Sequence, residues 1–200
     1  VDTFEGRAFV GLVPFTMRGV RPVWSPSIPW LSSFHEVNVR TYVHRGGRDP
    51  GVWFFSLDAA NPVGVLVGRT AWKLPYHFAR MRLALEGPAI SYASERRWPP
   101  PRPAACALRY EPVGPVRPAS AGTLEHFLVE RYVLYARSGG RFLAGRVHHS
   151  PYPLQPARVE ALDEGLLAAS GIERPRSAPL VHYARGVDVD VFPLGPAAPV

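Results

Sequence analysis

The sequence predicts a mainly β protein of the α+β class, built as a β-barrel or a strongly curved sheet with two or three helices. The 23 prolines are spread along 200 residues, a density that breaks long helices and favours short strands. Short segments alternate between apolar and polar side chains, and glycine-containing turns separate many of them. A series of short antiparallel strands of this kind is typical of barrels and curved sheets.

The clearest strand is predicted at 36–44. Val37, Val39, Thr41 and Val43 fall on one face, and Glu36, Asn38, Arg40, Tyr42 and His44 fall on the other. Hairpins are predicted around Gly87 and around Gly139-Gly140, and Gly46-Gly47 marks another turn. The remaining predicted strands are 8–15, 52–57, 79–85, 89–97, 104–110, 133–137, 141–148, 180–183 and 187–192.

Three segments carry helix signals. Asn61 followed by Pro62 is typical of a helix start, so a short helix is favoured up to Thr70, although Val63–Val67 also suits a buried strand. Thr123 can cap a helix over 123–132, whose apolar residues line one face. Residues 156–170 are predicted as a helix that Gly171 ends.

The length favours a single domain, predicted over 1–192, followed by a flexible proline- and alanine-rich tail at 193–200. Proline-rich loops are predicted at 18–29 and 98–103. The chain opens on Val1 within what reads as a strand and turn, so we expect that an N-terminal piece precedes it.

Charge and cysteine content limit the function classes. The net charge is +7, but the basic residues are spread along the chain and Arg96-Arg97 is their only adjacent pair, so nucleic-acid binding is not predicted. The single cysteine, Cys106, excludes an internal disulfide and favours a reducing cytoplasm. No apolar run approaches the length of a membrane span, and no signal segment opens the chain.

General catalytic motifs are absent from the sequence. It holds no glycine-rich phosphate loop, no nucleophile elbow and no zinc-protease motif, so neither a cofactor nor a metal is predicted. His148 and His149 are adjacent on a predicted strand and therefore point to opposite faces, which disfavours a shared metal site.

The polar face of the 36–44 strand is the first candidate site. One interpretation is a wet sheet face. The other is the lining of a barrel lumen, where Glu36 and Asn38 would help form a polar ligand site and Arg40 would clamp a carboxylate.

Two further segments concentrate functional side chains. Residues 68–77 hold Arg69, Tyr76, His77 and the only lysine of the chain, Lys73. The alternative is an ordinary surface turn with a solvent-facing lysine. Glu130-Arg131-Tyr132 lies at the end of a predicted helix, where an arginine serves as a cap or in an ion pair.

Four segments resemble the YqjF-like family of bacterial proteins of unknown function: 6–15, 36–43, 74–77 and 127–132. The resemblance covers nearly the whole chain, and the family normally carries a further N-terminal segment. That family in turn looks like a distant relative of acetoacetate decarboxylase. In this sequence the likeness is carried by Leu57-Asp58, Asn61-Pro62, Val67-Gly68-Arg69 and Pro75. That relation implies a closed, mostly antiparallel β-barrel or cone with flanking helices, and relatives that assemble into oligomers.

The decarboxylase relation also implies a pair of adjacent lysines directly after the proline. One lysine forms a Schiff base with a keto acid and the other lowers its pKa. This sequence has Tyr76 and His77 at those two positions, so the lysine pair is missing. Fold kinship without the nucleophile does not establish the activity.

These observations lead to one main hypothesis and two alternatives. The main hypothesis is a protein that binds or processes a small organic acid or carbonyl compound in the barrel lumen, through Glu36, Arg40, Arg69, Tyr76 and His77. His77 is the preferred acid/base because the ordinary histidine pKa lies near neutrality. The alternatives are imine chemistry at Lys73 and a non-enzymatic interaction module; a homo-oligomer is compatible with each.

Overall fold

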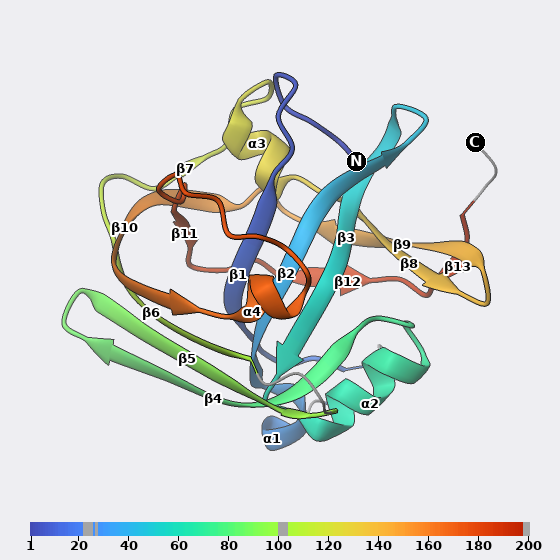
Figure 1. Ribbon diagram of the computed structural model, residues 1–200, viewed down its shortest axis with the longest axis horizontal. Helices are drawn as coiled ribbons and strands as arrows, with labels where there is room; N and C mark the ends of the chain where they lie inside the picture. Colours follow the sequence, from blue (N-terminus) through green and yellow to red (C-terminus); the bar gives the residue numbers. More distant parts are fainter. Residues whose placement is uncertain (22–25, 27, 100–103, 198–200) are drawn as a thin grey trace.

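The computed structural model describes residues 1–21, 26, 28–99 and 104–197 (Figure 1). The strands are β1 Val10–Met17, β2 Phe34–Arg45, β3 Arg48–Ala59, β4 Tyr76–Glu86, β5 Ala89–Trp98, β6 Ala105–Pro112, β7 Arg117–Pro118, β8 Val133–Ser138, β9 Arg141–His149, β10 Pro153–Glu164, β11 His182–Ala184, β12 Val189–Val191 and β13 Gly195–Pro196. The helices are α1 Pro29–Ser32, α2 Pro62–Thr70, α3 Leu124–Val129 and α4 Leu166–Ala169. The predicted mainly β class is confirmed.

One large curved sheet contains the described strands in the order β11-β10-β6-β5-β4-β3-β8-β9-β12, with β1 and β2 joined to it through β3. The predicted hairpins at Gly87 and at Gly139-Gly140 connect β4 to β5 and β8 to β9. Most strand pairs are antiparallel, as predicted, but β3 pairs in parallel with both β4 and β8. The α2 crossover makes the β3–β4 pair parallel because it returns the chain to the same end of the sheet.

The sheet branches at β3 (Figure 1). One edge of β3 pairs with β2 over most of its length, while the other edge pairs with β8 near its start and with β4 near its end. Gly51 permits the close approach of β8, since a Cβ there would lie 2.3 Å from the Val133 carbonyl oxygen. Because the sheet branches, other parts of the chain pack against both faces of β2 and β3.

Two hydrophobic clusters consequently lie on opposite faces of β2. The first cluster, which we call the β5-side core, includes Val37, Val39 and Tyr92. The second, the β8-side core, includes Tyr42 and Leu134. The interpretation of the 36–44 polar face as a wet surface is therefore wrong, because the face opposite the valines is also covered.

Helix α2 begins as predicted. The Asn61 side chain accepts hydrogen bonds from the backbone N–H groups of Val63 and Gly64, and Pro62 is the first helical residue. The same amide donates to the Leu31 carbonyl at 2.6 Å, which ties the start of α2 to α1. The strand alternative for this segment is excluded.

The prediction of a helix over 156–170 is wrong for most of that range. Residues 157–164 pair with β6 as part of β10, with a register shift between Val159 and Ala161. Only α4 is helical, and Gly171, with φ +77°, follows its end. Pairing with β6 satisfies the backbone of this segment, and that long-range interaction outweighs the local helix preference.

Helix α3 is shorter than predicted. Thr123 caps it by accepting from the His126 backbone N–H at 3.3 Å, but the helix ends at Val129. Tyr132, expected in the helix, instead precedes β8. The segment expected as a flexible tail is paired in part, because Gly195 and Pro196 pair with β9.

Parts of both predicted proline-rich loops, 22–25, 27 and 100–103, lie outside the described residues, as do 198–200 of the predicted tail. Within the described ranges, no helix is both long and apolar enough to cross a membrane.

Candidate functional site

The polar row of β2 lies in the interior. Glu36 and Asn38 are exposed by only 1% and 3%, and Arg40 is half-buried. Strand alternation places them on the same face as Tyr42, which belongs to the β8-side core. Residues that look like a solvent-facing strand in the sequence therefore form a buried polar strip between β2 and the β8-side core.

Glu36 and Tyr76 form the best-defined contact of this strip. The Tyr76 hydroxyl donates a hydrogen bond to Glu36 Oε2 at 3.0 Å. Burial raises the pKa of the Glu36 carboxyl to about 8; the Tyr76 hydrogen bond opposes this shift and the charge of Asp58 adds to it. At neutral pH the neutral acid therefore predominates, which gives the site a carboxylic proton that can be donated.

Three buried polar atoms, on β2 and in the segment before β4, have no hydrogen-bond partner among the described residues: Asn38 Oδ1, Arg40 Nε and Trp72 Nε1. Trp72 and Tyr76 both pack against the β8-side core. An unsatisfied buried polar group costs about 1–3 kcal/mol, so such groups are normally matched by water or a ligand. Two donors and one acceptor are thus unpaired on the Glu36 face of β2 and in the residues packed against the β8-side core.

His77 lies on the other face of β4, away from Glu36. It pairs in register with Asp58, which forms a buried ion pair with Arg96 at 2.7 Å. Burial, with a contribution from the charges of Arg96 and Arg69, lowers the pKa of His77 to about 4. The reason for preferring His77 as an acid/base, a pKa near neutrality, does not hold at this position; its Nδ1 is buried without a partner within the described chain.

Arg40 and Arg69 differ in what holds them. A terminal nitrogen of Arg40 donates to the Leu128 carbonyl at 3.3 Å, which leaves Nε free within the described chain. Arg69 donates to the Tyr76 carbonyl at 2.6 Å and lies over the Trp98 ring. Arg69 therefore holds the start of β4, while Arg40 keeps a donor for a ligand.

A second polar cluster lies where the end of α3 meets the end of β9, and sequence analysis missed it as a unit. Glu130 accepts from the Tyr132 hydroxyl and from the Tyr152 backbone N–H. The His149 ring stacks on Tyr132 and contacts Tyr152. Glu130, Tyr132 and His149 were each noticeable in the sequence, but the end of α3 and the end of β9 meet only in the fold.

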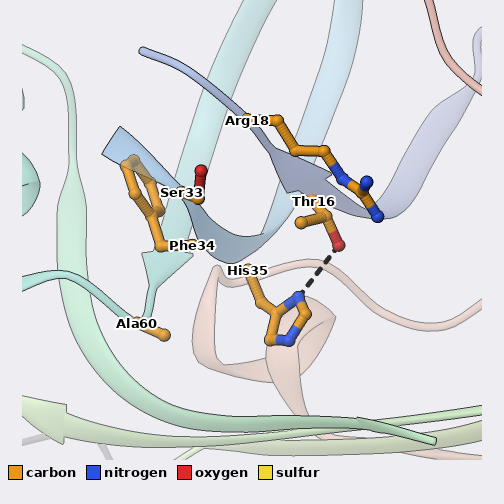
Figure 2. Close-up of a pocket in the computed structure, with 6 residues that line it drawn as sticks. All are labelled: Thr16, Arg18, Ser33, Phe34, His35 and Ala60. Atoms are coloured by element: carbon orange, nitrogen blue, oxygen red, sulfur yellow. Dashed lines mark hydrogen bonds between the residues drawn. The ribbon is translucent and has the colours of Figure 1, made fainter. Parts of the chain in front are cut away.

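A surface hollow of about 460 Å³ lies elsewhere, lined by Thr16, Arg18, Ser33, Phe34, His35 and Ala60 (Figure 2). The Thr16 hydroxyl and His35 Nδ1 are hydrogen-bonded at 2.9 Å. Burial lowers the pKa of His35, and the charge of Arg18 contributes. His35 is on the Val37 face of β2, so this hollow does not contain the strip at Glu36.

Comparison with known proteins identifies the family of this chain. Residues 1–188 match the model of the DUF2071 family, described as an uncharacterized conserved protein. The chain belongs to the DUF2071 family. It is 38% identical over 194 residues to the uncharacterized protein YqjF of Bacillus subtilis. The matched region covers 97% of this chain and 79% of YqjF. The predicted YqjF-like resemblance is confirmed.

The predicted decarboxylase-like fold is confirmed as well. This DUF2071 chain is similar to the crystal structure of acetoacetate decarboxylase from Legionella pneumophila, with a TM-score of 0.51 and 14% identity over 84% of this chain and 68% of that one. At this identity the likeness concerns the fold alone.

In this DUF2071 chain, the two residues at the positions that the resemblance assigns to a lysine pair lie on opposite faces of one strand. Tyr76 and His77 are successive residues of β4 and point to opposite faces, so they cannot contact one small ligand together. Lys73 is exposed in the turn before β4 with a left-handed φ of +53°. It makes no hydrogen bond or ion pair with Glu36 or Tyr76, two residues that the structure describes.

Proposed function

We propose that this DUF2071 protein binds a small organic acid or carbonyl compound at the buried polar strip of Glu36, Asn38, Arg40 and Tyr76. The observation that carries the proposal is the hydrogen-bonded Glu36–Tyr76 pair, together with unpartnered buried atoms of Asn38 and Arg40 on the same face of β2. Small-ligand sites combine apolar walls with a few convergent polar groups, which is the composition of this strip.

The available groups favour this ligand class. The Arg40 Nε–H and the Trp72 Nε1–H are donors, which match the oxygens of a carboxylate or carbonyl group. The protonated Glu36 adds a donor for a carbonyl oxygen near neutral pH. Imine chemistry at Lys73 gains no support because that side chain is exposed outside the strip. The cytoplasmic location and the homo-oligomer stay predictions from the sequence.

The test is calorimetric titration with acetoacetate, pyruvate and butyrate, using Arg40→Met and the matched control Arg80→Met. Both variants remove one positive charge from the sheet, but Arg80 is exposed on β4. We expect Arg40→Met to weaken acid binding by about 10- to 100-fold, the cost of a hydrogen bond to a charged group, and Arg80→Met to bind like the wild type. Equal affinities of the two variants, or no acid bound by the wild type, would contradict the proposal.

A further inference from the structure

The surface hollow of Figure 2 is formed where three neighbouring strands end or begin. Thr16 lies near the end of β1 and His35 near the start of β2, and the two are partners in the register of that antiparallel pair. Ala60 directly follows β3, and its backbone N–H donates to the His35 carbonyl at 3.0 Å. The volume of about 460 Å³ lies within the range typical of small-molecule sites, about 300–1,000 Å³.

The charge of the hollow comes from Arg18. This residue is exposed just beyond β1, and none of the six described residues that line the hollow is acidic. Within the described chain, no carboxylate forms an ion pair with Arg18. Burial lowers the pKa of His35 and the Arg18 charge adds to this effect, so the unpaired positive charge acts inside the hollow. Such a guanidinium favours an anionic ligand.

The Thr16–His35 hydrogen bond adds one donor whichever way its proton lies. The bond joins Thr16 Oγ1 and His35 Nδ1 at 2.9 Å. If the hydroxyl donates, the neutral ring carries its proton on Nε2; if Nδ1 donates, the hydroxyl proton is free. Each arrangement leaves one N–H or O–H that this pair does not use. In Figure 2 the Thr16 hydroxyl and the Arg18 guanidinium extend in the same direction.

Ser33 supplies a third donor. Its hydroxyl oxygen accepts from the Gly19 backbone N–H at 3.3 Å, and its hydroxyl proton has no acceptor among the residues that the structure describes. A serine hydroxyl can donate one hydrogen bond while it accepts another. Donors are thus presented to one hollow from Arg18, from Ser33 and from the Thr16–His35 pair. The group that matches several separate donors is an anion with several oxygens.

The rest of the lining is apolar and comes from Phe34 and Ala60. Phe34 is half-buried at the start of β2, and the end of its ring lies beside α2, since a Cβ added at Gly64 would be 3.4 Å from it. A ring fixed in this way gives the carbon part of a ligand an apolar surface to contact. The lining therefore combines an anion-binding side with an apolar side.

We propose that this hollow is a second ligand site, which binds the phosphate group of a small organic phosphate monoester and holds its carbon part against Phe34. The three separate donors match the three terminal oxygens of such a phosphate, whereas a carboxylate has only two oxygens. The proposal does not rest on ligand binding at the strip. The two sites share no residue, and strand alternation places His35 and Glu36 on opposite faces of β2.

Calorimetric titration at fixed ionic strength with phenyl phosphate, inorganic phosphate and benzoate tests the site. The variant is Arg18→Met, and the matched control is Arg48→Met, which removes the same charge at an exposed position at the other end of β3 from Ala60. We expect the wild type to bind phenyl phosphate more tightly than either other anion. Arg18→Met should weaken this binding by about 10-fold or more, the loss of a hydrogen bond to a charged group, and Arg48→Met should bind like the wild type.

The other outcomes overturn the proposal in distinguishable ways. Equal affinities of Arg18→Met and Arg48→Met, or no binding of phenyl phosphate to the wild type, would refute the site. Benzoate bound as tightly as phenyl phosphate would refute the choice of a phosphate group. Inorganic phosphate bound as tightly would refute the contact of the carbon part with Phe34.

Nitrogen-15 NMR of the histidine side chains locates the ligand independently. The His35 signals, assigned with His35→Gln, should shift when phenyl phosphate is added at constant pH, because the ligand lies against the Thr16–His35 pair. The signals of His126 should not move, since α3 packs against Phe9, which precedes the opposite end of β1. His35 signals that stay unchanged at saturating phenyl phosphate would refute the location.

Discussion

At the scale of single residues, Glu36 is the group most affected by its surroundings. A carboxyl that is 1% exposed cannot ionise at its ordinary pKa, because burial removes the water that stabilises the charge. The Tyr76 hydroxyl restores part of that stabilisation by donating a hydrogen bond to the Glu36 carboxyl. Burial raises the pKa of this hydroxyl well above its usual value. The pair is therefore a neutral hydrogen-bonded unit at neutral pH.

Replacing Tyr76 with Phe tests this coupling. We expect the pKa of Glu36 to rise further, because the hydrogen bond that lowers it is lost, and stability to fall by about 1 kcal/mol. Carbon-13 NMR titration of the glutamate carboxyls and urea unfolding measure the two effects. Tyr183→Phe is the control, since Tyr183 lies on β11 away from Glu36. An unchanged Glu36 titration would mean that Tyr76 does not tune it.

At the scale of elements, α2 and β4 position the site through the Arg69–Tyr76 hydrogen bond and a close approach at Gly68. A Cβ added at Gly68 would lie 2.3 Å from the Tyr76 ring, so the helix reaches β4 only because this residue has no side chain. Gly64, one turn earlier, has room: its added Cβ would lie 3.4 Å from the Asn61 side chain and from Phe34. Two glycines of one helix thus have different roles.

The variants Gly68→Ala and Gly64→Ala separate packing from helix propensity. We expect Gly68→Ala to lose about 1–3 kcal/mol through overpacking and to displace Tyr76 from Glu36. Gly64→Ala should be neutral or stabilising by up to about 1 kcal/mol, because alanine favours helix. Chemical denaturation compares them. Similar stabilities for both variants would show that the Gly68 contact has no energetic weight.

At the scale of the whole molecule, Glu36 and His77 are two buried groups whose large pKa shifts contribute to the pH dependence of stability. Burial raises the pKa of Glu36 from 4.5 to about 8, so the folded protein keeps a proton that the unfolded chain releases. The pKa of His77 moves from 6.5 to about 4, so the folded protein lacks a proton that the unfolded chain binds. Below about pH 6.5 the two groups change the free energy of unfolding in opposite directions as the pH rises. Between about pH 6.5 and 8, of these two effects, the decrease due to Glu36 remains.

The stabilising neutral form of Glu36 is therefore lost as pH rises through about 8. We expect the free energy of unfolding to fall by about 1–2 kcal/mol more in the wild type than in Glu36→Gln between pH 6.5 and 8.5. Urea unfolding at several pH values measures the difference, and Glu95→Gln, an exposed position on β5, should retain the wild-type slope. Parallel pH profiles for wild type and Glu36→Gln would contradict the raised pKa.

Sequence analysis predicted the candidate site only in part. Of the predicted site residues, Glu36 and Tyr76 are hydrogen-bonded and Arg40 shares the face of Glu36 on β2, while their role in ligand binding stays a prediction. His77 and Lys73 were grouped with them because they are close in sequence, yet strand alternation and solvent exposure separate them. Proximity along the chain does not indicate which face of a strand a side chain occupies in the fold.

The amino-acid sequence alone determined the mainly β class, the glycine turns, the Asn61 cap and the alternation of β2, because each depends on residues near one another in the chain. Only the tertiary structure decided that both faces of β2 are buried, that 157–164 pair with β6, and that His149 packs against Tyr132 and Tyr152. These features depend on burial and charge supplied by distant strands. Long-range packing therefore makes an ordinary alternating strand into a candidate binding site.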